Sequence, residues 1–228
     1  MFKPRHPEYQ CYRSLRGSLV LIEGIIGAGK TTLGKSLETY LNGIGLVAKF
    51  FPEYVNRPLL SQYILNMKRY AYSFQLFMLG RRIEIYREAE RFSATGGIAI
   101  VDRSLPGDVA FARMQYQNGN FSTEEWDLYN EVINTENIPV PTACIFLECS
   151  PDTSLIRVQT RGIKAEISGY SLEYMTLLSK EYDIVRQTLE NTCCVAVPWD
   201  IVQQLDNGQV ITQVLRQILD QLLTQLEK

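Results

Sequence analysis

The sequence is poor in the residues on which several classes of enzyme depend. Its single histidine, His6, stands near the first residue, so catalysis by a histidine side chain is not expected. Five cysteines, at positions 11, 144, 149, 193 and 194, show none of the spacings of a metal site. Three of them, Cys144, Cys193 and Cys194, lie in apolar runs that indicate buried, reduced thiols, which favours an intracellular, cytoplasmic setting.

The chain also lacks a strong charge imbalance and a long apolar run. A formal net charge of −2 over 228 residues gives no electrostatic basis for binding nucleic acid. No apolar run reaches the roughly 18–20 residues that cross a membrane, and residues 1–17 lack the apolar stretch of a signal peptide. We therefore expect no membrane partner, a loose N-terminal arm over residues 1–17, and a single domain over residues 18–228.

What the chain does have is a regular alternation of strand and helix patterns. Short apolar runs, rich in β-branched and aromatic residues, predict strands that are buried on both faces. The expected strands are residues 19–23, 47–51, 98–101, 143–147 and 193–197, and the expected helices are residues 31–41, 58–67, 72–92, 109–116, 123–134, 154–160, 172–190 and 210–226. This order predicts an α/β fold in three layers, with a five-stranded parallel sheet between two layers of helices.

A phosphate-binding loop follows the first expected strand. Gly24, Gly29, Lys30 and Thr31 occupy the four fixed places of Gly-x4-Gly-Lys-Thr, between a strand and a helix. The backbone N–H groups of such a loop and the helix N-terminus bind phosphate oxygens. Lys30 is expected to reach the β- and γ-phosphates, and the Thr31 hydroxyl to ligate Mg2+. The residues expected to bind a nucleoside triphosphate here are Gly24, Gly27, Ala28, Gly29, Lys30, Thr31 and Thr32.

Charged residues follow the other expected strands. Glu53 comes after the second strand, Asp102-Arg103-Ser104 after the third, and Arg157, Arg161 and Glu166 after the fourth. Ligands of open α/β sheets bind at the carboxyl ends of the strands, so we expect these side chains to meet the phosphate-binding loop.

Together these segments resemble the deoxynucleoside kinase family, which shares its P-loop NTPase fold with thymidylate kinases, over roughly residues 18–200. The resemblance implies that Glu53 is the base acting on the sugar 5′-hydroxyl and that Arg103 clamps phosphoryl oxygens. It also implies that Asp102 holds Mg2+, that ATP or another nucleoside triphosphate is the donor, and that the protein is a homodimer acting in nucleotide salvage. Ile26 stands where thymidylate kinases typically have an acidic residue, which favours a nucleoside as acceptor.

The same resemblance assigns a base pocket. Phe74 and Gln75 match the family's base-reading pair, and Gln75, Met78 and Arg82 are spaced to share one helix face, although Arg81 competes with Arg82 as the inward-facing residue. Arg82 and Asp108 match an arginine and an aspartate of relatives that accept deoxycytidine, deoxyadenosine or deoxyguanosine. Phe111 corresponds to the base-stacking phenylalanine. The pocket is thus expected to disfavour thymidine.

The segment after the fourth strand resembles the family's short arginine lid. Arg157 and Arg161 share a helix face and are expected to close over the donor phosphates. Glu166 matches the carboxylate that contacts the sugar 3′-hydroxyl, and Tyr63 is the best candidate for its tyrosine partner.

Two other functions remain open at this stage. A deoxynucleoside monophosphate kinase of the thymidylate type would need a further cation, for which Arg57, Lys68 and Arg69 are candidates. A non-catalytic P-loop switch or scaffold is less favoured, because the sequence contains neither the guanine-binding Asn-Lys-x-Asp motif nor the Asp-x-x-Gly switch motif. In such a protein, Glu53, Gln75 and Glu166 would also have no role.

Overall fold

The structure is a computed structural model that describes residues 6–136, 138, 140–189, 192–199, 205–206 and 209–227. Its strands are β1 (Leu19–Glu23), β2 (Ala48–Phe51), β3 (Ile98–Asp102), β4 (Ala143–Glu148), β5 (Cys193–Pro198), β6 (Leu205–Asp206) and β7 (Gln209–Val210). Its α-helices are α1 (Tyr9–Tyr12), α2 (Lys30–Gly43), α3 (Arg57–Leu65), α4 (Met67–Ala94), α5 (Leu105–Gln117), α6 (Thr123–Thr135), α7 (Pro151–Arg161), α8 (Lys164–Gly169), α9 (Leu172–Leu189) and α10 (Thr212–Leu226). A short 3₁₀ helix, η1 (Arg13–Leu15), follows α1.

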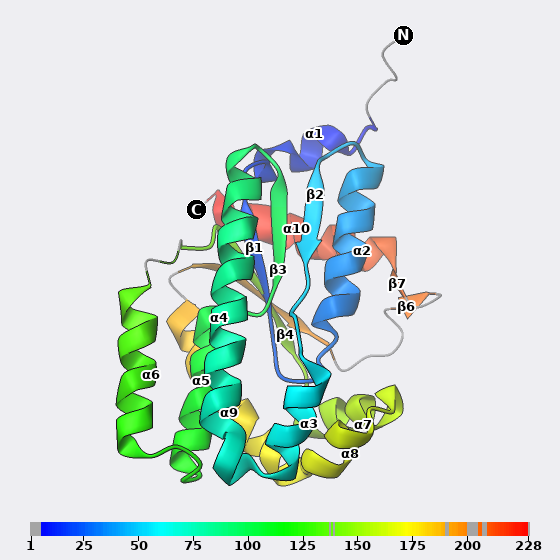
Figure 1. The fold of residues 1–228 in the computed structure, drawn as a ribbon. Helices are drawn as coiled ribbons and strands as arrows, with labels where there is room; N and C mark the ends of the chain where they lie inside the picture. The colour runs from blue at the N-terminus through cyan, green and yellow to red at the C-terminus, as the bar shows by residue number, and fades with distance from the viewer. Residues whose placement is uncertain are drawn as a thin grey trace.

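The predicted three-layer fold is confirmed. Five parallel strands form one sheet in the order β2-β3-β1-β4-β5, with β1 paired to both β3 and β4. Helix α4 packs on β3 and β1 in front of the sheet in Figure 1, and α10 passes behind it. All residues of β1 and β3 are buried, as strands covered on both faces require.

The described part of the N-terminal segment is packed against the domain, so the expectation of a loose arm is wrong there. Tyr9, Tyr12 and Leu15 recur every three residues and are all buried in the main hydrophobic core. The Tyr12 hydroxyl donates to Asp220 Oδ1 of α10 at 2.9 Å. Residues 1–5 of the predicted arm lie outside the described residues.

The elements differ from the sequence-based expectation in several places. Helix α1 and the β6–β7 hairpin were not expected, and α4 begins at Met67 instead of residue 72, α5 at Leu105 instead of 109 and α7 at Pro151 instead of 154. Helix α8 was not predicted, because six residues are too few to show a helical period. Val210 pairs in the small β6–β7 hairpin, so the last helix begins at Thr212. Residue 190, the expected end of the helix from 172, lies outside the described residues. No helix in the described ranges combines the length and apolar character that crossing a membrane demands.

Candidate functional site

A cavity of about 840 Å³ opens at the carboxyl ends of the strands, beside the phosphate-binding loop. It brings together residues that are far apart in the sequence. The expected site residues that line it are Gly27, Gly29, Lys30, Thr31, Thr32, Glu53, Phe74, Gln75, Met78, Arg82, Asp102, Arg103, Phe111, Arg157, Arg161 and Glu166. Gly24 and Ala28 belong to the same loop, whereas Tyr63 and Asp108 lie behind the cavity wall.

The phosphate-binding loop depends on a glycine conformation and leads into a helix whose first N–H groups are available. Gly29 has φ +99°, and a Cβ there would lie 2.7 Å from Nε1 of Trp199, so glycine is required. Helix α2 begins at Lys30 without a side-chain cap, which leaves the N–H groups of its first turn to bind an anion.

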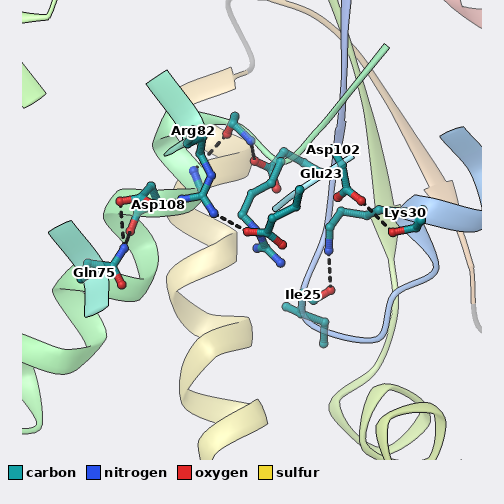
Figure 2. A network of polar contacts seen from close by, with 12 residues as sticks. Glu23, Ile25, Lys30, Gln75, Arg82, Asp102 and Asp108 are labelled. Atoms are coloured by element: carbon teal, nitrogen blue, oxygen red, sulfur yellow. Dashed lines mark hydrogen bonds and ion pairs between the residues drawn. The ribbon is translucent and has the colours of Figure 1, made fainter. Parts of the chain in front are cut away.

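The Lys30 side chain folds back over this loop. Its ammonium donates to the carbonyl oxygens of Gly24 at 2.8 Å and Ile25 at 3.0 Å (Figure 2). Burial, followed by the charge of Arg103, lowers the pKa of Lys30 to about 8, against the opposing charges of nearby carboxylates. The amine therefore still carries its charge at neutral pH.

Thr31 and Asp102 form an oxygen pair at the mouth of the loop. The Thr31 hydroxyl donates to Asp102 Oδ2 at 2.7 Å, and Asp102 Oδ1 is buried without a hydrogen-bond partner in the described part of the chain. Burial raises the pKa of Asp102, with Lys30 and Arg103 opposing that shift. An unpaired carboxylate oxygen beside a hydroxyl suits Mg2+, which takes oxygen ligands and shares them with phosphate and water.

Glu53, Arg103 and Arg82 form the centre of the cavity. Glu53 Oε1 accepts from Arg103 Nε at 3.0 Å and also contacts Arg82 Nη2. Burial alone would raise the pKa of Glu53, but the charges of Arg103, Arg82 and Lys30 together outweigh burial and lower it to about 2. Glu53 is therefore an ionised carboxylate at neutral pH.

Arg103 has a strained backbone conformation, and several contacts hold it in place. Its φ of 77° is the one positive value among the described residues other than glycine. The side chain lies over the ring of Phe111, with 4.8 Å between guanidinium carbon and ring centroid, and donates to the Tyr182 hydroxyl. Its preceding strand and its own N–H, bonded to Ile22 O at 3.0 Å, hold the turn in place.

Glu23 supports this turn from below and was missed by the sequence reasoning. The carboxylate is fully buried and accepts from the backbone N–H groups of Gly24, at 3.1 Å, and Ser104. It thereby joins the phosphate-binding loop to the segment that carries Arg103. A charged residue inside a fully apolar strand run, directly before the first loop glycine, is the signal that identifies it.

The residues expected to form a base pocket lie together at the cavity, with Gln75, Met78, Arg82 and Phe111 lining it and Asp108 behind them. Gln75 Nε2 donates to Asp108 O at 3.1 Å and Oδ2 at 2.8 Å (Figure 2). Tyr129 donates to Asp108 Oδ2 at 2.6 Å. Arg82 is buried and paired with Asp108, whereas Arg81 is half-buried, lies over the Tyr54 ring and pairs with Glu84, so the inward-facing arginine is Arg82. Asp108 thus orients Gln75 and Arg82 from behind instead of lining the cavity.

The expected pairing of Tyr63 with Glu166 is not present. The Tyr63 hydroxyl accepts from Gln115 at 2.7 Å and lies 3.3 Å from the Tyr174 hydroxyl, and its ring stacks on Phe74. The tyrosine that lines the cavity on the side of Glu166 is Tyr170, whose pKa is raised by burial and further by the charge of Glu166. Its place depends on how α8 packs against α3, which no local pattern in the sequence predicts.

The two arginines of the expected lid make different contacts. Arg161 Nη2 pairs with Glu166 Oε2 at 2.6 Å across the α7–α8 turn. Arg157 donates to the carbonyl oxygens of Ala28 at 3.2 Å and Trp199 at 2.6 Å. Arg157 thus braces the phosphate-binding loop against the segment after β5, which also brings Trp199 to the cavity wall.

A parallel sheet with a phosphate-binding loop, a carboxylate held by two arginines and an oxygen pair for a cation defines a P-loop kinase. The comparisons with known proteins make this more specific. A model of the deoxynucleoside kinase family matches residues 20–224, so the chain belongs to the deoxynucleoside kinase family.

Individual relatives agree with this assignment. The chain is 31% identical over 172 residues to a deoxyadenosine kinase of Dictyostelium discoideum, with 75% of this chain and 67% of that protein covered. It is 29% identical over 160 residues to a deoxyguanosine kinase of Lactobacillus johnsonii, with 67% and 68% covered. The fold matches that of a deoxyadenosine kinase from M. mycoides with bound dATP, with a TM-score of 0.72, 23% identity, and 92% of this chain and 100% of that chain covered.

Proposed function

We propose that the protein transfers the γ-phosphoryl group of ATP, or of another nucleoside triphosphate, to the 5′-hydroxyl of a deoxyribonucleoside. The observation that carries this proposal is the arrangement inside one cavity. Lys30 and Gln75 both line this cavity and lie on opposite sides in Figure 2. Glu53 is paired with Arg103 and Arg82, and Arg82 is linked through Asp108 to Gln75. Donor phosphates, reacting hydroxyl and base therefore each have groups of suitable chemistry in the expected order.

At the donor end, the loop amides and Lys30 would bind the β- and γ-phosphates, and Arg161 lines the same cavity. Thr31 and Asp102 would hold Mg2+, which neutralises charge on the transferred phosphoryl group. The rigid loop supplies these donors without reorganisation during the reaction.

At the centre, Glu53 would accept the hydrogen bond of the 5′-hydroxyl and take its proton as the new bond forms. An ionised carboxylate suits this role, because it orients the hydroxyl and receives the proton only when phosphoryl transfer has made that hydroxyl acidic. Arg103 would face the charge that develops on the phosphoryl oxygens. Glu166 would accept from the sugar 3′-hydroxyl while Arg161 holds its other side.

For the base, the pocket supports deoxycytidine, deoxyadenosine or deoxyguanosine over thymidine. Gln75 is held with its amino group on Asp108, and Arg82, paired with Asp108 behind it, adds a charge to this wall. The thymine methyl group next to such a pair would desolvate charge without a compensating hydrogen bond, a cost of about 1–3 kcal/mol per group. Met78 and Phe111 would contact the faces of the base.

A second candidate function is phosphoryl transfer to a deoxynucleoside monophosphate. It is favoured by one observation: Arg57 lines the cavity on the acceptor side and supplies the additional cation that an acceptor phosphate requires. Lys68 and Arg69, the other two candidates, are not among the described lining residues.

Radiolabelled phosphate transfer from ATP to the four natural deoxynucleosides and their monophosphates tests both functions at once. We expect transfer to nucleosides, with thymidine the poorest, and a requirement for Mg2+. Transfer only to monophosphates would replace the first proposal with the second, and a preference for thymidine would contradict the base pocket. Light scattering in the same buffer tests the proposed homodimer, for which the exposed Leu128 and Val132 on α6 offer an apolar surface.

A further inference from the structure

A continuous set of polar contacts joins the base pocket to the catalytic carboxylate. Gln75 donates to Asp108, and Asp108 pairs with Nη1 of Arg82; Figure 2 labels these three residues. Nη2 of Arg82 pairs with Glu53. The Arg82 side chain is 6% exposed and that of Asp108 is fully buried, so solvent screens these pairs little. One guanidinium therefore contacts a group that recognises the base and a group that acts on the 5′-hydroxyl.

The contacts on Glu53 are asymmetric. Arg103 Nε and Arg82 Nη2 both approach Oε1, and no donor to Oε2 is found within the described ranges. Two cations on one oxygen fix the plane of the carboxylate and leave the other oxygen to accept a hydrogen bond from the acceptor. Arg82 thus contributes to the direction in which Glu53 presents its free oxygen.

We propose that Arg82 is a positioning residue for phosphoryl transfer as well as part of the base pocket. Held by Asp108 on one side, it holds Oε1 of Glu53 on the other, so that Oε2 faces the 5′-hydroxyl. This inference rests on the proposed kinase function, and it assigns to the base pocket a share in kcat and not only in KM.

Removing Arg82 would change the charges around both Glu53 and Asp108. Without Arg82, Glu53 keeps Arg103 as its only direct cationic partner in the described part of the chain, and Asp108 keeps only neutral donors. Since Arg103 also contacts Tyr182 and would face the phosphoryl group, it is a poor sole anchor for the carboxylate. The proposal therefore predicts that the cost of removing Arg82 is transmitted through Glu53.

A double-mutant cycle on turnover separates this role from base recognition alone. The variants are Arg82→Met, Glu53→Gln and the double substitution, assayed with ATP and saturating deoxynucleoside. We expect Arg82→Met to lower kcat by roughly 10- to 100-fold in the wild-type background but by no more than about 3-fold in the Glu53→Gln background, which is the coupling of contacting residues. Equal fold-losses in both backgrounds would overturn the proposal.

Two controls keep the result interpretable. Arg81→Met removes a cation from the neighbouring position, whose side chain pairs with Glu84, and is expected to leave kcat within about 2-fold of wild type. Arg82→Lys retains the charge and should recover part of kcat. It also replaces Arg82→Met in the cycle if Arg82→Met does not fold. If Arg82→Lys or Arg82→Met changes KM alone, Arg82 only reads the base. Transfer by the unmodified protein to any deoxynucleoside tests the kinase function separately.

Discussion

At the scale of single residues, the electrostatics of Glu53 decide how it can act. The low pKa of about 2 makes it a weak base before the reaction, because Arg103, Arg82 and Lys30 stabilise its charge. A strong base is not needed, since the attacking hydroxyl becomes acidic only as its bond to phosphorus forms. In the proposed reaction, the same cations that weaken Glu53 as a base would also orient it and surround the transferred group, so positioning would outweigh basicity.

The first prediction follows from that role. Glu53→Gln keeps the size of the side chain but cannot accept a proton, so we expect deoxynucleoside binding to persist and kcat to fall by roughly 10²–10⁴-fold. Steady-state kinetics with a binding measurement on the same variant checks this. A loss confined to KM would make Glu53 a binding residue.

Glu166 gives a second test at this scale. Its carboxylate is buried, paired with Arg161 and lines the cavity. We expect Glu166→Ala to lower kcat/KM for natural deoxynucleosides by roughly 10-fold or more, as for a lost hydrogen bond to a charged group, and to affect 2′,3′-dideoxy analogues much less. The comparison of the two substrate series is the measurement, and equal losses on both would remove Glu166 from the sugar site.

At the scale of elements, the helices and strands that could be predicted are those whose pattern lies in one continuous stretch of sequence. The β1–loop–α2 unit follows from one stretch of sequence, because strand, glycines and lysine stand at fixed spacing. Each central strand is apolar up to a final acidic residue, since helices cover both faces, so its position could also be predicted. Helix α8 gave no such signal: it is stabilised by packing, as shown by Gly169, whose Cβ would overlap Ile64 of α3.

Site residues on separate elements were predictable only in part. Resemblance to the family placed Gln75, Arg82 and Asp108 in one pocket, but which of them faces the cavity depends on the packing of α4 against α5. The choice between Tyr63 and Tyr170 depends likewise on α3 and α8. Glu23 and Trp199 reach the site because the sheet brings their strand ends together, which the sequence alone does not specify residue by residue.

The contact between α2 and β2 supports a prediction about stability. Gly34 lies in the middle of α2, and a Cβ there would overlap the ring of Phe50, whereas Gly80, in the middle of α4, has open space around it. Both positions would gain helix propensity of about 1 kcal/mol from alanine. Overpacking costs about 1–3 kcal/mol and should outweigh that gain only at Gly34.

We therefore expect Gly34→Ala to be less stable, and Gly80→Ala more stable, than the wild type. Urea unfolding of the two variants, with the free energy of unfolding extrapolated to water, checks both signs. If Gly34→Ala were as stable as Gly80→Ala, the ring of Phe50 would not be closely packed against α2.

At the scale of the whole molecule, one core includes both ends of the described chain. The main hydrophobic cluster contains Tyr12 and Leu15, the five-stranded sheet, and Leu222 of α10. A second, smaller cluster lies among α3, α4, α5 and α6, and its Leu60 also lines the cavity on the acceptor side. The cavity is thus built on both clusters: Leu60 belongs to the smaller one, Phe74 packs against it, and Phe111 packs against the main one.

The last prediction concerns the segment before β1, which the sequence suggested was a loose arm. Leu15 is 1% exposed and lies in the main core, whereas Leu65, at the end of α3, is 83% exposed. Replacing either leucine by alanine removes the same atoms, so the two variants differ only in how buried the replaced side chain is.

Leu15→Ala should create a cavity and lower the free energy of unfolding by about 2–5 kcal/mol, while Leu65→Ala should stay within about 0.5 kcal/mol of the wild type. For a chain of this length the first change corresponds to a fall in Tm of roughly 4–20 °C. Calorimetry of the two variants under identical conditions provides the comparison. Because the same core holds β1 and α2, Leu15→Ala should also weaken ATP binding near its lowered Tm. Equal Tm values for the two variants would mean that the segment does detach in solution and that β1 begins the stable domain.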